Sequence, residues 1–303
     1  MFATLLGSLP RPPLGADAPR RALVEAAVRA QETAGIEPVT DGGLPGASDP
    51  VAAWQVTASL TERAVKQVLR GPYSLAWSTE ANASLREAAT LAHAVASNSI
   101  LRALAAAGCP LIEIHEPSAT AIGTDATERA LFREAHLRLL DGLDGTHCSL
   151  VITGGSADAA GADTILAAPY ASLAVDLIAG PDNWRLVADA PGEIGIVCGA
   201  LSPAADGDDG PEVLLWAAAY AASTGARGPD RVGLATASSL AGLPWPDAIR
   251  KIERLGAAAR LAEVPASEAV SSLDPRAVSS RAAALGYVGR DPSRGPRSDH
   301  DPT

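Results

Sequence analysis

The 303-residue sequence lacks the features that extracellular, nucleic-acid-binding and membrane proteins need. It has only three cysteines, Cys109, Cys148 and Cys198, too few and too dispersed for a disulfide framework. Aromatic residues make up 4%, so no platform for stacking nucleic-acid bases is visible. The 24 Lys and Arg are scattered and the net charge is −11, which excludes a basic face for phosphates. No apolar run approaches the roughly 18 residues of a membrane span.

These absences predict a cytoplasmic protein with free thiols that binds small molecules and has neither nucleic acid nor membrane as a partner. We expect no signal peptide in the first residues, MFATLLGSLPRPP. Hydrophobic residues make up 47%, which is enough for one large barrel or two modest domains.

Short apolar runs alternate with alanine-rich helical segments along the chain. The runs are 2–9, 36–41, 65–71, 110–116, 148–154, 172–178, 194–201 and 231–237, and the main helical segments are 18–34, 84–107, 127–140, 212–223 and 246–262. Eight strands separated by helices predict an α/β fold, a single (β/α)8 TIM barrel over residues 1–288. Residues 289–303 are polar and aperiodic, which predicts a disordered C-terminal tail.

Polar and titratable residues stand close to the ends of these runs. In a barrel of this kind the chemistry takes place at the carboxyl ends of the strands. The candidates are Ser8, Arg11, Asp41, Trp77, Ser78, His115, Glu116, His147, Cys148 and Asp176. We expect Ser8, Asp41, Trp77, His115 and Asp176 to line one mouth of the barrel.

Four segments carry a resemblance to a known family. GSLPRP (7–12), GPYSLAWS (71–78), AGCPLIEIHEP (107–117) and GPDRVGL (228–234) occur in an order that resembles the C-terminal catalytic barrel of cobalamin-independent methionine synthase. The resemblance extends to about residue 261. It implies a methyltransferase that moves a methyl group from a methyltetrahydrofolate-type co-substrate to a thiol held on zinc.

The methyl-donor side of the family's site is the better preserved part. The resemblance implies that Trp77 and Ser78 lie against the flat pterin, because an exposed indole offers a face for stacking. The alternative for Trp77 is a packing role at the rim. It also places Ser8, Arg11 and Glu116 among the substrate-binding residues.

The acceptor side differs from the family. Gly43 and His115 stand where the family has carboxylates for an amino acid's ammonium group, and Leu201 replaces a histidine before Ser-Pro. We therefore expect an acceptor other than homocysteine. His115 and Asp41 are the candidate catalytic residues. The alternative for His115 is a hydrogen-bonded rim residue that Glu113 or Glu116 satisfies.

The family's zinc ligands are only partly matched. His147, Cys148 and Asp176 form a tentative and incomplete set, and Arg231 stands near the position of the last cysteine. Adjacent residues on a strand point to opposite faces, so only one of His147 and Cys148 should face the lumen. A structural role for both residues stays open.

Two other functions remain possible from the sequence. One is lyase or decarboxylase chemistry on the same barrel with Arg11, Asp41 and His115. The other is a non-catalytic accessory or binding protein that has lost the zinc site. Arg231 in GPDRVGL favours these functions over zinc-dependent transfer, because a guanidinium cannot ligate a metal.

Overall fold

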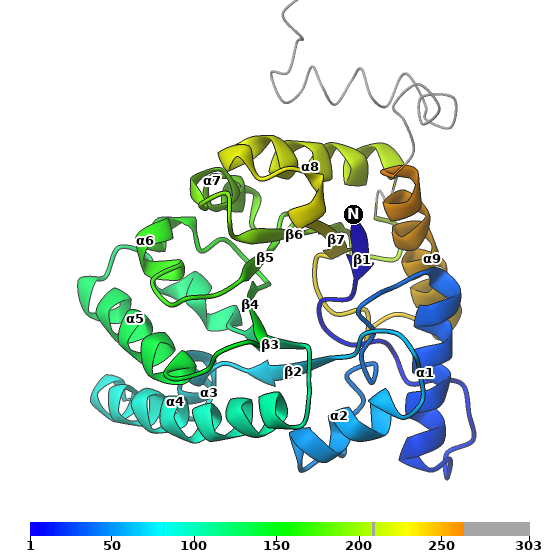
Figure 1. The fold of residues 1–303 in the computed structure, drawn as a ribbon, viewed down its shortest axis with the longest axis horizontal. Helices are drawn as coiled ribbons and strands as arrows, with labels where there is room; N and C mark the ends of the chain where they lie inside the picture. The colour runs from blue at the N-terminus through cyan, green and yellow to red at the C-terminus, as the bar shows by residue number, and fades with distance from the viewer. Residues whose placement is uncertain (81, 208–209, 264–303) are drawn as a thin grey trace, which may run out of the picture.

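The computed structural model describes residues 1–80, 82–207 and 210–263, and its centre is a parallel β-sheet with helices outside it (Figure 1). The described strands are β1 (Phe2–Thr4), β2 (Lys66–Arg70), β3 (Leu111–His115), β4 (His147–Ile152), β5 (Ser172–Asp176), β6 (Gly195–Leu201) and β7 (Val232–Thr236). They hydrogen-bond in the order β1-β7-β6-β5-β4-β3-β2. This is the parallel α/β arrangement that the alternating pattern predicts.

The helices follow the strands and cover the outer face of the sheet. They are α1 (Arg20–Ala34), α2 (Pro50–Ala58), α3 (Pro72–Thr79), α4 (Ala83–Ala106), α5 (Ala126–Leu140), α6 (Ala162–Ile165), α7 (Trp184–Asp189), α8 (Pro211–Ser223) and α9 (Trp245–Leu261). All five helices predicted from the sequence are present, with ends that differ by two residues or fewer. None of the described helices is both long and apolar enough to cross a membrane.

Helix α5 illustrates how the sequence fixes these elements. Asp125 precedes it, and the Asp125 carboxylate accepts hydrogen bonds from the backbone N–H groups of Thr127 (2.8 Å) and Glu128 (3.1 Å). This is the capping arrangement that satisfies the first amides of a helix. Phe132 and His136, four residues apart, share the buried side of α5.

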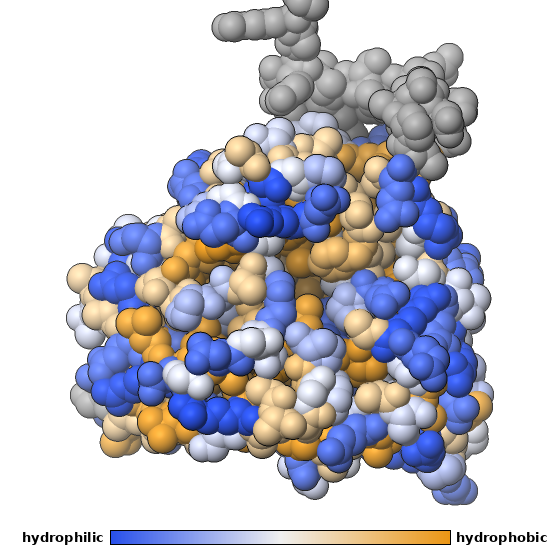
Figure 2. Space-filling view, viewed as in Figure 1, coloured by the Kyte–Doolittle hydropathy of each residue, from blue (hydrophilic) through white to orange (hydrophobic). Residues whose placement is uncertain are grey.

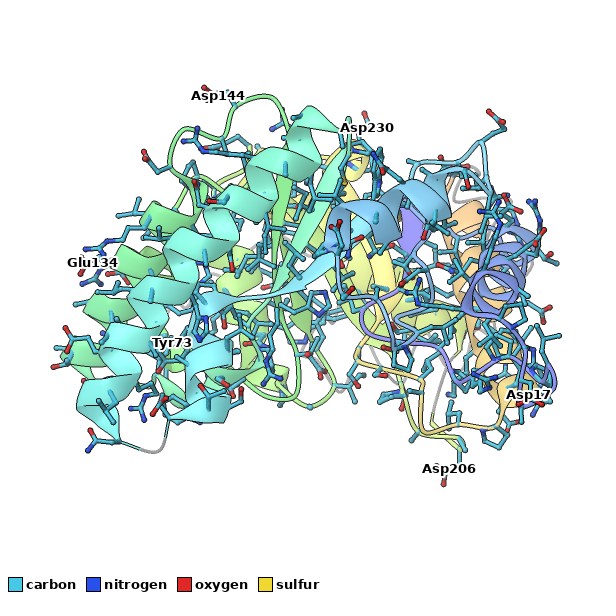
Figure 3. The ribbon with its side chains drawn as sticks, turned by 90° about the horizontal axis from the view of Figure 1, so that it is seen from below. Asp17, Tyr73, Glu134, Asp144, Asp206 and Asp230 are labelled. Carbon is cyan, nitrogen blue, oxygen red and sulfur yellow. The ribbon has the colours of Figure 1, made fainter. Side chains whose placement is uncertain are left out.

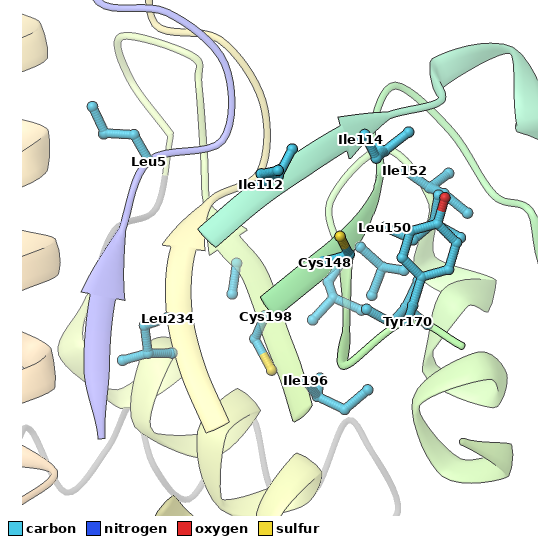
Figure 4. Close-up of a cluster of buried hydrophobic side chains, with 14 of the residues drawn as sticks. Leu5, Ile112, Ile114, Cys148, Leu150, Ile152, Tyr170, Ile196, Cys198 and Leu234 are labelled. Carbon is cyan, nitrogen blue, oxygen red and sulfur yellow. The ribbon is translucent and has the colours of Figure 1, made fainter. Parts of the chain in front are cut away.

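The strands alternate between two buried faces. Ile112, Ile114, Cys148 and Leu150 point outward into the main core against the helices (Figure 4). A second, smaller core lies on the inner face and consists of Leu6, Val151, Ala174, Val197 and Ala235. Leu6 follows β1 and Val151 lies on β4, with three strands between them in the sheet. Because these residues pack together, the sheet must curl around its inner face.

The segment predicted as the second strand, 36–41, does not form one. It makes a single bridge, Val39 with Val65, and the Glu37 N–H donates to the Ala3 carbonyl at 2.8 Å. Pro38 has no N–H to donate, so a regular ladder cannot continue through it. The described sheet therefore has seven strands and curls as part of a barrel would. A complete (β/α)8 barrel is not confirmed.

All strands run in one direction, so the sheet has an amino end and a carboxyl end. Figure 3 shows Asp144 and Asp230, which precede β4 and β7, at one end, and Asp17 and Asp206, which follow β1 and β6, at the other. We call these ends the amino mouth and the carboxyl mouth. The predicted tail, 289–303, and the last part of the predicted barrel range, 264–288, lie outside the described residues.

Candidate functional site

The carboxyl mouth collects the residues that follow the strands. His115 and Asp176 end β3 and β5, Ser8 follows β1, and Glu116 follows β3. Asp41 follows the bridged segment next to β1. The parallel sheet therefore places four of the five residues predicted to line one mouth, together with Glu116, at one end of the molecule, as expected for a curled α/β sheet.

A chain of charged side chains crosses the inner face below this mouth. Lys66 Nζ lies 2.6 Å from Glu113 Oε1, and both side chains are almost fully buried. Lys66 Nζ also donates to the Leu5 carbonyl at 2.6 Å. Glu113 Oε2 lies 3.1 Å from His115 Nε2. Lys66, Glu113 and His115 thus form one connected network, which we call the lumen triad.

The lumen triad holds its carboxylate ionised. Burial alone would raise the pKa of Glu113, but the Lys66 ammonium and the hydrogen bond from His115 bring that pKa below its usual range. An ionised Glu113 fixes the orientation of the His115 ring through the contact with Nε2. The structure therefore confirms Glu113, of the two partners considered, as the neighbour of His115.

His115 is the side chain of this network that reaches the carboxyl mouth. It is the last residue of β3, and its side chain is 15% exposed, whereas Glu113 is 3% exposed. Because Glu113 engages Nε2, the Nδ1 atom is the ring nitrogen directed elsewhere. A positioned imidazole with one nitrogen anchored is suited to proton transfer.

Glu116, expected to bind substrate, is instead fully buried against α3. Its two oxygens accept hydrogen bonds from the backbone N–H groups of Tyr73 (3.0 Å) and Ser74 (2.7 Å). His136 Nε2 lies 3.2 Å from the same carboxylate, and a Cβ on Gly71 would lie 2.1 Å from it. Glu116 therefore anchors the start of α3, and sequence reasoning missed the role of His136.

Trp77 and Ser78 lie on α3 and are exposed, but Trp77 already has packing partners. The Arg86 guanidinium lies over the indole, 4.1 Å from its centroid, and the Tyr73 ring lies 5.6 Å away. Ser78 Oγ donates to the Leu75 carbonyl at 2.8 Å. A flat ligand could stack on the face of Trp77 that Arg86 covers only if Arg86 moved.

Ser8, Arg11 and Asp41 lie in the loops beside β1. The Asp41 carboxylate pairs with Arg20 at 2.6 Å and accepts from the Gly43 N–H at 2.9 Å. Arg11 donates to the carbonyls of its own loop, at residues 15 and 16. A Cβ on Gly43 would lie 2.1 Å from Ser8 Oγ, and Gly43 has a φ of +65°. The loop therefore excludes the family's glutamate at position 43 unless Ser8 moves.

The tentative zinc ligands do not come together. His147 begins β4 at the amino mouth, whereas Asp176 ends β5 at the carboxyl mouth. Cys148 points outward into the helix-side core, as the alternation of a strand requires (Figure 4). Asp176 accepts hydrogen bonds from the backbone N–H groups of residues 154, 178 and 179 at 2.8 to 3.0 Å. These residues therefore do not form one metal site.

The protonation of the thiols agrees with this geometry. Burial raises the pKa of Cys109 to about 11 and that of Cys148 and Cys198 to about 12. All three thiols lie in the helix-side core. Within the described ranges, no group of three His, Cys, Asp or Glu residues is arranged to hold a metal ion. The residues present do not fit the family's zinc.

Comparison with known proteins identifies part of the chain. Residues 19–138 match the family model described as "Cobalamin-independent synthase, Catalytic domain". This part of the chain is therefore similar to the catalytic domain of cobalamin-independent synthases. The range includes the lumen triad, Asp41 and Trp77, and the match confirms the resemblance predicted from the sequence. No curated protein matches the chain.

Solved structures show that the synthase-like fold extends over most of the chain. A B12-independent methionine synthase from Shewanella sp. W3-18-1, in complex with selenomethionine, has a TM-score of 0.70 at 16% identity, covering 86% of this chain and 96% of that one. A putative vitamin-B12-independent methionine synthase from Listeria monocytogenes has a TM-score of 0.65 at 15% identity, with 86% and 97% covered. A methyltransferase from Methanosarcina mazei has a TM-score of 0.53 at 15% identity, with 85% and 94% covered.

Proposed function

We propose that the protein is a methyltransferase that takes a methyl group from a folate-type donor and gives it to an acceptor other than homocysteine. The synthase-like domain over residues 19–138 supports this class of reaction. The single observation that carries the proposal is the lumen triad, because it presents His115 at the carboxyl mouth with one ring nitrogen fixed by Glu113.

In the proposed reaction His115 supplies a proton to the donor. The acceptor's lone pair forms a bond to the methyl carbon, and the bonding pair of the methyl–nitrogen bond stays on the donor nitrogen. The His115 imidazolium gives that nitrogen a proton, and the proton released by the acceptor passes to water. A tertiary amine leaves readily only when protonated, so the reaction needs a general acid. Leu201 replaces the family's histidine and cannot donate a proton, so His115 would take that role.

The ionised Glu113 prepares His115 for this role. It holds the His115 ring in place through Nε2, so that the other ring nitrogen stays directed away from Glu113. Lys66 in turn keeps Glu113 charged in a buried position. Lys66 and Glu113 are therefore positioning residues, and no step of the reaction passes through a metal.

The carboxylates of the mouth support an acceptor without an amino-acid ammonium group. Glu116 and Asp176 already accept backbone hydrogen bonds, and Asp41 pairs with Arg20. Gly43 supplies no carboxylate. Binding an ammonium group would therefore lack the charge-assisted hydrogen bonds that hold it, which are worth about 1.5 to 3 kcal/mol each.

We predict that the protein forms no methionine from homocysteine. Purified protein is incubated with added zinc, methyltetrahydrofolate carrying a polyglutamate tail, and homocysteine, and methionine is followed by mass spectrometry. The expected rate is that of the reaction without protein, and the expected zinc content after dialysis is well below one ion per chain. Turnover on the order of 10 per second, the median for enzymes, with bound zinc lost in Cys148→Ala, would contradict the proposal.

The lyase or decarboxylase alternative gains no support from the loops. Arg11 is tied to carbonyls of its own loop, and Arg20 neutralises Asp41. A binding protein without activity would give neither methionine nor any other methylated product, and it would leave the donor intact with every acceptor tested.

A further inference from the structure

A cavity opens at the amino mouth, which is opposite to the carboxyl mouth where His115 lies. Its volume is about 410 Å³, and Phe2, Glu113, His147, Ser149 and Val197 are among the residues that line it. Figure 2 shows the molecule hollowed near the middle of the face seen there, inside the ring of strands in Figure 1. Cavities of about 300 to 1,000 Å³ are typical of small-molecule sites.

Small residues on the inner face leave this space empty. Gly195 and Gly233 project no side chain, and a Cβ on Gly233 would lie 2.5 Å from the Phe2 ring. Phe2 therefore lies across Gly233 and forms one wall of the cavity. In barrels of this class, large branched residues normally fill the same layers. The amino end of the lumen is thus open because glycines stand on the inner face where larger residues would fill it.

A row of polar side chains crosses the cavity wall. Glu113, Ser149 and Ser172 are register partners on β3, β4 and β5. The Glu113 carboxylate is already paired with Lys66 and His115, the other members of the lumen triad. Ser172 Oγ lies 2.8 Å from His147 Nε2. Ser149 is 1% exposed, and its Oγ has no hydrogen-bond partner within the part of the chain that the structure describes. A buried hydroxyl without a partner is unfavourable unless a ligand or water satisfies it.

We propose that this cavity binds a small, uncharged, mainly apolar molecule whose single hydroxyl group hydrogen-bonds to Ser149 Oγ. Phe2, Leu111 and Val197 provide apolar walls that cannot compensate the desolvation of a charge. Glu113 inside the cavity, and Glu193 and Asp230 in its lining, disfavour an anion, and the Arg231 guanidinium in the same lining donates to the Gly192 carbonyl at 3.1 Å. The ligand is not the substrate of the proposed reaction, because it enters from the other end of the sheet.

The test uses a matched pair of probes, 4-ethylphenol and ethylbenzene, which differ only in the hydroxyl. Affinities are measured by ligand-observed NMR on the full chain. Both should bind the parent protein. Ser149→Ala should weaken 4-ethylphenol about fivefold, as expected for loss of one hydrogen bond, and change ethylbenzene less than twofold. Ser239→Ala, the same substitution in an exposed loop at the carboxyl mouth, should change neither affinity.

A second variant tests the location without disturbing the core. Ala171 is exposed and lines the entrance, so Ala171→Trp should fill it and reduce binding of both probes at least tenfold while the protein stays folded. Equal losses of both probes in Ser149→Ala, unchanged binding in Ala171→Trp, or no binding to the parent would each overturn the proposal. The last result would mean that the cavity holds only water.

Discussion

Lys66→Met is expected to lower the free energy of unfolding by about 3 to 5 kcal/mol, the usual cost of removing one partner from a buried ion pair. The Lys66 side chain is 0% exposed, and Glu113, at 2.6 Å, would lose the ammonium that keeps it charged. Met has a similar volume, so the loss reports on charge more than on packing. Urea denaturation followed by circular dichroism gives the value.

Two control variants distinguish the loss of the buried ion pair from the general effect of replacing a basic residue with Met. The double variant Lys66→Met/Glu113→Leu removes both charges and should recover most of the lost stability, since buried pairs can be replaced by apolar residues at little cost. Arg138→Met breaks the exposed pair of Arg138 with Glu134 on α5 and should cost about 1 kcal/mol or less. A loss below 1 kcal/mol for Lys66→Met itself would show that the pair is not buried in solution.

His115→Gln is expected to lower the rate of methyl transfer by a factor of roughly 10² to 10⁴, the usual contribution of a general acid. Glutamine retains a polar group near Glu113 but cannot deliver a proton at neutral pH. The rate is measured as consumption of the methyl donor with the acceptor at saturation, so that kcat is read separately from KM.

His93→Gln provides the matched control for this variant. His93 lies on α4, away from the strand ends, and the same substitution there should leave the rate within a factor of about two of the parent. If His115→Gln transferred methyl groups as fast as His93→Gln, the acid would have to be another residue.

The helices and the direction of the sheet could be read from the sequence, because their hydrophobic periodicity is local. Strand ends were less predictable. The run 2–9 is a strand only over Phe2–Thr4, because the chain leaves the sheet after it. The run 36–41 contains Pro38, whose missing N–H limits pairing to one bridge.

The site was predictable where a residue's role depends on strand position alone. His115 at the end of β3 is the clearest case, and the opposite orientations of His147 and Cys148 follow from strand alternation. Lys66 was not predictable, since a lysine in a short strand usually reaches solvent. Its burial depends on Leu5 and Glu113, which are distant in sequence and meet it only in the curled sheet.

The backbone contacts of carboxylates were also beyond sequence reasoning. Glu116 and Asp176 follow strands as catalytic carboxylates do, and nothing local distinguishes the two cases. Only the folded loops show that backbone N–H groups of α3 donate to the Glu116 carboxylate. The N–H groups of residues 154, 178 and 179 likewise donate to the Asp176 carboxylate. His136 was missed for the same reason, because its partner Glu116 comes from another element.

The central claim is that the methyl donor binds at the carboxyl mouth beside His115. The most direct measurement is NMR of protein with labelled histidine rings as methyltetrahydrofolate is added. His115 and His147 lie on the neighbouring strands β3 and β4 at opposite ends, roughly 13 Å apart along the strand direction. The account predicts that the His115 signal shifts most and that His93 stays unchanged. A largest shift at His147, or no shift at any histidine, would contradict it.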